Sequence, residues 1–171
     1  MRYLAALLPC ALLLAACSAQ TNTVAAVAAP TPAGTVARSP VPFDQAAAEA
    51  AVRQTVTLFG AQLKNVSRLA PPQSLRQQLR ASYTNLVTPR LLQKWLATPT
   101  QTPGRDVSSP WPDSIAVDTV DCADADHCKV RGEVRYVTSN EVEHGGTADT
   151  RSIRLDVDRT ADGWRIDAVQ M

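Results

Sequence analysis

The sequence has no apolar run long enough to remain in a membrane as a helix. In the chain of 171 residues, the N-terminal apolar stretch spans residues 3 to 16, which is 14 residues, and it contains Pro9. A membrane-spanning helix needs about 20 apolar residues. We therefore expect no retained transmembrane helix.

The sequence also has no excess of charge of one sign. It holds 17 lysines and arginines against 16 aspartates and glutamates, for a formal net charge of +1. Proteins that bind nucleic acid normally carry a basic patch or stripe, whereas the basic residues here are spread among acidic ones. We expect no nucleic-acid partner.

Residues typical of catalytic and metal sites are scarce. There are two histidines, His127 and His144. A predicted strand of roughly ten residues separates them by about 30 Å, so they cannot share one site. No serine lies in a glycine-flanked nucleophile elbow. The sequence predicts no catalytic residue, no metal and no cofactor, and hence a protein that is not an enzyme.

The N-terminus carries an export signal. Arg2 supplies a positive charge, the apolar run follows, and two small alanines precede Cys17, which is the three-part layout of a secretory signal. Leu14-Ala15-Ala16-Cys17 resembles the lipobox of bacterial lipoproteins. That resemblance implies cleavage before Cys17 and lipidation of its sulfur. A secreted protein cut near Ala19 is the alternative.

The lipoprotein interpretation predicts the location and division of the chain. Two acyl chains on Cys17 hold a protein stably on a bilayer, which places the domain outside the cytoplasm, at the cell membrane or the outer membrane. Residues 1–16 are then the signal peptide, and residues 17–42 are the lipidated cysteine with a flexible linker rich in alanine, threonine and proline. Residues 43–171 form one folded domain.

The cysteines reduce to one pair. Cys10 leaves with the signal and Cys17 carries lipid, so Cys122 and Cys128 remain. In an exported protein we expect these two to form a disulfide. Zinc ligation by the pair is the functional alternative.

Helical periodicity occupies the first half of the domain. The chain predicts a helix over residues 45–68 with Asp44 as its N-cap, a second over residues 73–86, and a short third after Thr88-Pro89. Gly60 lies off the apolar stripe and is expected to cost a little stability. The apolar stripes are Val52, Val56, Phe59, Leu63 and Val66; Leu75, Leu79, Tyr83 and Leu86; and Leu91, Leu92, Trp95 and Leu96.

The second half is predicted to be strands. Residues 98–113 are proline-rich and predict an irregular loop, in which Trp111 either packs as a lid or serves as an exposed binding aromatic. Four runs then alternate apolar with polar residues, and Ala161-Asp162-Gly163 predicts a tight turn before the last. The predicted fold is α+β, with three N-terminal helices packed on a four-stranded antiparallel sheet. The alternating apolar positions are Ile115 and Val117; Val130, Val134 and Tyr136; Ile153, Leu155 and Val157; and Trp164 and Ile166.

Three polar clusters are open to a functional or a structural interpretation. The three aspartates at positions 121, 124 and 126 offer oxygens for calcium or simply form a solvated turn, since their spacing does not match a calcium loop. Glu141, Glu143 and His144 form a polar loop. On the last strands, cross-strand ion pairs are expected between two sets of residues: Arg151, Arg154 and Arg165, and Asp156, Asp158 and Asp167.

The predicted order of elements and the ending Asp162-Gly163-Trp164-Arg165-Ile166-Asp167 resemble the cone-shaped superfamily named after nuclear transport factor two. The resemblance implies a pocket between sheet and helices. It offers no catalytic motif to carry over. Candidate pocket residues are Phe59, Tyr83, Trp95, Tyr136 and Trp164, of which most are expected to fill the core, and the two tyrosines are its best polar groups.

The leading hypothesis is a membrane-anchored, non-catalytic envelope lipoprotein that binds a protein partner or a small apolar ligand. A second hypothesis is an assembly component of a secretion or conjugation apparatus, because the periplasmic domains of such proteins are similar. A third is a cone-fold enzyme acting on a hydrophobic small molecule.

Overall fold

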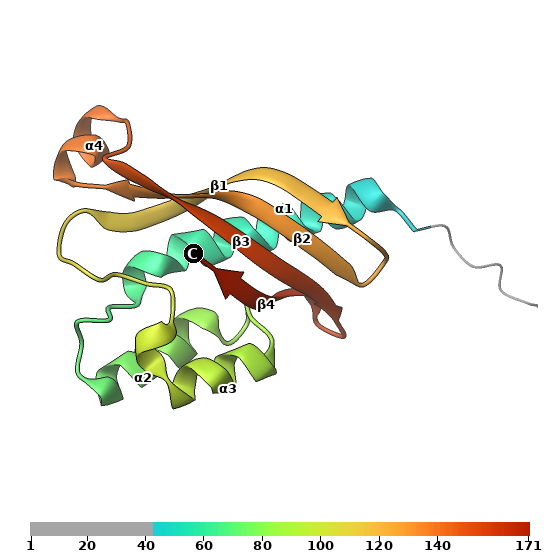
Figure 1. The fold of residues 1–171 in the computed structure, drawn as a ribbon, viewed down its shortest axis with the longest axis horizontal. Helices are drawn as coiled ribbons and strands as arrows, with labels where there is room; N and C mark the ends of the chain where they lie inside the picture. Colours follow the sequence, from blue (N-terminus) through green and yellow to red (C-terminus); the bar gives the residue numbers. More distant parts are fainter. Residues whose placement is uncertain (1–42) are drawn as a thin grey trace, which may run out of the picture. The chain divides into compact units, whose positions relative to one another are not determined.

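Residues 43–171 are described by a computed structural model of the chain (Figure 1). The predictions for the signal peptide, Cys17 and the linker lie outside these residues. The described part is α+β, with four antiparallel strands in the order β1-β2-β3-β4, as predicted. Its main elements are α1 (Gln45–Gln62), α2 (Pro72–Tyr83), α3 (Pro89–Ala97), β1 (Trp111–Cys122), β2 (His127–Val137), α4 (Ser139–His144), β3 (Asp149–Thr160) and β4 (Gly163–Gln170).

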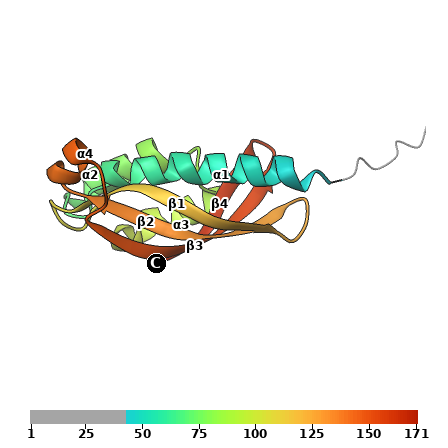
Figure 2. The same cartoon turned by 90° about the horizontal axis from the view of Figure 1, so that it is seen from above.

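The long helix α1 lies along one face of the sheet (Figure 2). Its N-cap is Asp44, whose carboxylate accepts a hydrogen bond from the backbone N–H of Ala47 at 3.0 Å. Val52, Val56 and Phe59 are fully buried on the side that meets the sheet. The four-and-three spacing of these residues is therefore the reason that α1 packs where it does.

The helix ends earlier than the sequence predicts. After α1 the chain makes one 3-10 turn (Leu63–Asn65), and Val66 is extended although it is fully buried. The carbonyl of Val66 accepts the N–H of Arg105 at 2.7 Å. The apolar spacing through Val66 was misleading because a tertiary hydrogen bond, rather than helix continuation, satisfies its backbone.

Helix α2 also stops short of its predicted end at Leu86. The segment after it pairs with β4, since Leu86 accepts the N–H of Ile166 at 2.9 Å and Thr88 donates to the carbonyl of Ile166 at 2.8 Å. Helix α3 begins as predicted, with Thr88 as its N-cap and Pro89 in its first turn. In Figure 1, α2 and α3 lie beyond the edge of the sheet that β4 forms.

The sheet begins earlier than predicted. Residues 99–101 form a 3-10 turn, and β1 starts at Trp111, which pairs with Val137 in β2. Trp111 is half-buried as the first residue of this strand. At the far end of the same hairpin, Cys122 and Cys128 face each other and form the predicted disulfide, with a sulfur–sulfur distance of 2.08 Å.

The polar stretch after β2 is a short helix, α4, where a loop was predicted. Thr138 and Glu141 form a reciprocal capping box, in which the Glu141 carboxylate accepts the backbone N–H of Thr138 at 2.8 Å. Hydrogen bonds from the Thr138 hydroxyl and backbone, and from Asn140, lower the pKa of Glu141 to about 2. The spacing of Thr138 and Glu141 is the sequence signal that identifies this helix.

Among the described residues, no helix combines the length and the apolar character needed to cross a membrane.

Candidate functional site

Three of the five candidate pocket residues pack against one another. Phe59, Tyr83 and Trp95 come from α1, α2 and α3, and their exposed fractions are 0%, 0% and 3%. Their ring centroids lie 5.0 Å apart for Phe59 and Tyr83, and 5.5 Å apart for Tyr83 and Trp95. This aromatic cluster fills the space where the three helices meet.

The other two candidate residues lie apart from the aromatic cluster. Tyr136, on β2, is buried, and the guanidinium carbon of Arg151 lies 4.8 Å from its ring centroid. Trp164, at the start of β4, lines a hollow of about 300 Å³ beside the beginning of α1. The sequence-based grouping therefore combines residues from several parts of the domain.

The hydroxyl of Tyr83 holds a loop in place. It donates a hydrogen bond to the carbonyl of Pro103 at 2.9 Å. Burial raises the pKa of this phenol far above its ordinary value. Tyr83 thus stays protonated and fixes the loop before β1 to α2.

Strand β4 has one edge that is largely free of backbone partners. It pairs with β3 on one side. On its other side, within residues 43–171, β4 forms backbone–backbone hydrogen bonds only at Ile166, with Leu86 and Thr88. The carbonyls of Trp164 and Asp167 accept side-chain hydrogen bonds, from Thr55 at 3.3 Å and from Arg90 at 3.4 Å. Such an edge offers main-chain donors and acceptors to a further strand.

Two hollows lie along this edge and share Gln101 and Val169. We call them together the α3–β4 groove. The first, of about 300 Å³, is lined by Arg90, Leu91, Lys94, Trp95, Gln101, Asp167, Ala168, Val169 and Gln170. The second, of about 210 Å³, is lined by Arg68, Gln101, Thr102, Pro103, Val169 and Met171.

The groove combines positive charge with apolar surface. Leu91, Trp95 and Val169 contribute apolar side chains, and Lys94 contributes a cation. The other two cations of the lining are paired, Arg68 with Asp106 at 2.8 Å and Arg90 with Asp167. Thr102 is fully buried at the second hollow, and its hydroxyl has no hydrogen-bond partner among the described residues. An unpaired buried hydroxyl costs free energy.

The first hollow is built on a fixed junction between α3 and β4. The Thr88 hydroxyl donates to Asp167 at 2.7 Å, and Arg90 forms an ion pair with the same carboxylate. Burial alone raises the pKa of Asp167, but the hydrogen bonds from Arg90 and Thr88 outweigh it, so the pKa is lowered. Asp167 therefore stays ionised and holds the start of α3 against the strand.

We expect replacement of this N-cap to loosen the junction. Thr88→Ala removes the acceptor for the N–H of Leu91 and the donor to Asp167. The expected loss is about 1–2 kcal/mol of unfolding free energy, measured by urea denaturation. Thr57→Ala, on the exposed side of α1, is the control. An equal loss in both variants would contradict the structural role of Thr88.

The two histidines lie at different places, as the sequence predicts. His127 is the first residue of β2, and His144 is the last of α4, which follows that strand. His127 Nδ1 lies 3.1 Å from a carboxylate oxygen of Asp158. The hydrogen bond to Asp158 is the largest cause that raises the pKa of His127, and nearby Asp124 adds to it.

The pairing of His127 predicts a pH effect of defined sign. The protonated imidazole gains a carboxylate partner on folding, so the ion pair stabilises the folded domain when His127 is protonated. This contribution to folding stability is fully present below the ordinary pKa of histidine, and it is lost as the pH rises through the raised pKa of the folded state. Proton NMR titration of His127 should give a pKa above about 6.5. Asp158→Asn should lower it. A titration that this substitution leaves unchanged would contradict the pairing.

The aspartates of the β1–β2 hairpin take part in its turn. The Asp124 carboxylate accepts the backbone N–H groups of Asp126 and His127, each at 2.8 Å. This is an Asx-type turn. Among the described residues, no group of three or more histidines, cysteines, aspartates and glutamates is placed to hold a metal ion.

The predicted cross-strand ion pairs on the last strands are wrong. Arg151 pairs with Asp149 at 3.7 Å, and Arg165 pairs with Asp162 at 3.1 Å, each within its own strand or turn. Asp158 pairs with His127, and Asp167 with Arg90. Alternation along a strand identifies the exposed face but not which side chains on that face reach one another.

Comparisons with known proteins give limited similarity. No protein-family model and no curated protein matches the chain. Among solved structures, the chain is similar to the intermembrane-space region of the chloroplast protein ARC6, with 20% identity, a TM-score of 0.40, and coverage of 74% of this chain and 95% of that one. It is also similar to an Ntf2-like protein involved in plasmid conjugation, with 12% identity and a TM-score of 0.41 over 69% of this chain and 46% of that one.

Most of the groove was missed in the sequence. Of its lining residues, Trp95 alone was a candidate pocket residue. Gln101 and Thr102 lie in a stretch that predicted only a loop, and Val169 follows the predicted last strand. Alternation from Ile166 does not lead to Val169, three residues further on, because a β-bulge shifts the register between Ile166 and Ala168.

Proposed function

We propose that the chain is a lipid-anchored, extracytoplasmic binding module with no catalytic role, whose domain has the cone-shaped fold of the nuclear transport factor two superfamily. The order of α1, α2 and α3 before an antiparallel meander supports that fold. The aromatic cluster in the interior supports binding at the surface rather than chemistry in a central cavity.

The lipid anchor rests on the lipobox at Leu14-Ala15-Ala16-Cys17. Expression of the full chain with radiolabelled palmitate should label the protein. Cys17→Ser should abolish the labelling while the protein is still made. Equal labelling of both chains, or labelling of neither, would contradict the anchor.

We assign the binding role to the α3–β4 groove and its occupant to an extended segment of a protein partner. The observation that carries this assignment is the free edge of β4 beside the groove. A strand added to an exposed edge gains affinity from main-chain hydrogen bonds and specificity from pockets for alternate side chains. The cation of Lys94, which forms no ion pair within residues 43–171, favours an acidic side chain in that segment.

The test is selection of peptides from a random displayed library on residues 43–171, which contain the described hydrophobic core. Selected peptides should carry acidic residues and perturb the amide NMR signals of Leu91, Lys94, Gln101 and Val169. Perturbation elsewhere, or failure to select any peptide, would contradict the assignment. If a small apolar ligand perturbs the same signals and the peptides do not, the occupant of the α3–β4 groove is a small apolar ligand and not a segment of a protein partner.

Two variants with the same change in charge show whether peptide binding depends on a charge in the groove or on the overall charge of α3. Lys94→Gln and Gln93→Glu change the charge of α3 by the same amount, but Gln93 is exposed outside the groove. Lys94→Gln should weaken binding of an acidic peptide by about fivefold, in line with loss of one partly exposed ion pair. Gln93→Glu should have a smaller effect. Equal weakening by both would argue against a defined site.

A further inference from the structure

The face of the sheet opposite α1, here called the outer face, carries an unusual row of side chains. The strand register places Thr119, Arg131, Arg154 and Gln170 opposite one another across β1, β2, β3 and β4. All four are exposed. We call them the donor row, because each offers hydrogen-bond donors and the two in the middle are permanent cations.

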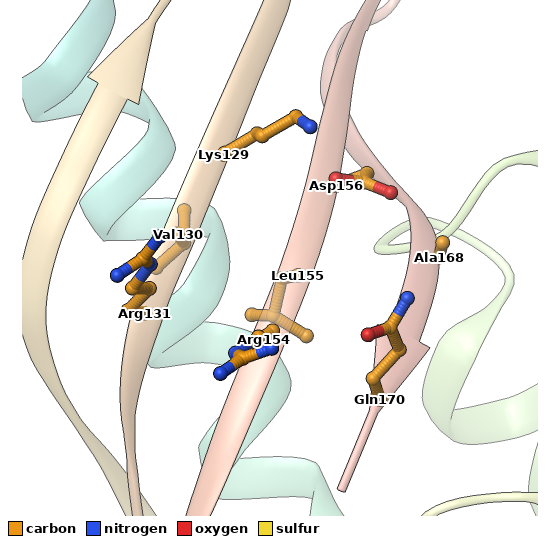
Figure 3. A pocket seen from close by; sticks show the side chains of 8 residues that line it. All are labelled: Lys129, Val130, Arg131, Arg154, Leu155, Asp156, Ala168 and Gln170. Carbon is orange, nitrogen blue, oxygen red and sulfur yellow. The ribbon is translucent and has the colours of Figure 1, made fainter.

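Two like charges at directly opposed positions destabilise a sheet. Arg131 and Arg154 are such a pair, and within residues 43–171 neither forms an ion pair with an acidic side chain. In Figure 3, where α1 passes behind the sheet, both guanidinium groups project to the same side. The fold therefore holds two adjacent positive charges without neutralising them.

The donor row borders a hollow of about 240 Å³, whose lining includes Arg131, Arg154 and Gln170. Ala168, with its small side chain, leaves space beside Gln170 on β4 (Figure 3). Lys129 and Asp156 also line the hollow, so its lining holds three cations and one anion. The excess charge at the hollow is that of the two arginines.

We propose that the donor row binds a phosphate monoester. Such a group carries a charge of about −1.5 to −2 at pH 7, which matches two guanidinium groups better than the single charge of a carboxylate does. Arginine forms paired hydrogen bonds to phosphate oxygens. Gln170, which lines the same hollow on β4, is placed to donate to a remaining oxygen. This site is separate from the α3–β4 groove in its chemistry, although Ala168 and Gln170 line hollows of both.

The test is an amide NMR titration of residues 43–171 at constant ionic strength. Glycerol 3-phosphate should give saturable shifts at Arg131, Arg154 and Gln170, and acetate should give much weaker ones. Vesicles that contain phosphatidic acid show whether the bound phosphate belongs to a lipid or to a soluble molecule. If the domain binds these vesicles and loses that binding when both arginines are substituted, the ligand is a lipid headgroup. If it binds glycerol 3-phosphate but not the vesicles, the ligand is a soluble ester.

Substitutions complete the test. Arg154→Gln should weaken glycerol 3-phosphate binding by about tenfold or more, as expected for loss of a charged hydrogen-bond partner. The control Arg135→Gln, on the same face of β2 but outside the hollow, should leave binding nearly unchanged. Arg131→Gln should also raise the melting temperature, because it relieves the like-charge opposition. Equal loss in Arg135→Gln, equal shifts with acetate, or no binding of either phosphate probe would overturn the proposal.

Discussion

Phe59→Ala is expected to lower the unfolding free energy of the domain by about 3–5 kcal/mol, the usual cost of removing a buried phenylalanine. Phe59 is fully buried on α1 and contacts the rings of Tyr83 and Trp95. Its removal leaves a cavity where three helices meet, and the rigid rings around it cannot easily close that cavity. Urea denaturation of residues 43–171, followed by circular dichroism, measures the loss.

Leu58→Ala is the matched control for this substitution. Leu58 precedes Phe59 on α1 but is 51% exposed, so its truncation should change stability by no more than about 0.5 kcal/mol. A loss of less than about 1 kcal/mol in Phe59→Ala would mean that the cluster does not hold the helices together. The interior would then be loose enough to admit a ligand.

The second large expected effect is the change in stability caused by Gly60→Ala, for which helix propensity and packing predict opposite signs. Helix propensity alone predicts that Gly60→Ala stabilises α1 by about 1 kcal/mol. In the structure, however, a Cβ atom at this position would lie 2.8 Å from the backbone nitrogen of Ile115. Because α1 approaches β1 this closely, we expect Gly60→Ala to destabilise the domain by about 1–3 kcal/mol.

Gln54→Ala tests propensity without this contact, because Gln54 is an exposed residue of α1. It should change stability by only a few tenths of a kcal/mol in the favourable direction. Thermal unfolding of the two variants beside the parent chain gives the comparison. A stabilised Gly60→Ala variant would contradict the close packing of α1 on β1.

The sequence predicted those elements in which local pattern and packing agree. The spacing of Val52, Val56 and Phe59 predicted α1, and the alternation of apolar and polar residues predicted β2 and β3. Each of these elements has one buried face and one solvent-exposed face. The turn at Gly163 was also predicted correctly, and its positive φ of 108° explains the glycine. Thr88-Pro89 marked the start of α3 because both residues satisfy local helix-terminus requirements.

Features that depend on distant residues were not predictable in this way. Val66 leaves the helix because Arg105 bonds to its carbonyl, and Leu86 leaves α2 because it pairs with Ile166. The α3–β4 groove arises from the same pairing, which ends after Ile166 and leaves residues 168–170 of β4 without a backbone partner on that side within residues 43–171. The donor row depends on the register of four strands, including three irregular positions that alternation cannot reveal.

Isotope-filtered NOE spectroscopy on the complex of residues 43–171 with a selected peptide distinguishes binding at the edge of β4 from binding within the interior of the domain. Binding at the β4 edge should give contacts from the peptide to Lys94, Gln101 and Val169, with none to the rings of Phe59 and Tyr83. Contacts to those two rings would show that the interior opens to hold the ligand, and would rule out the β4 edge as the binding site.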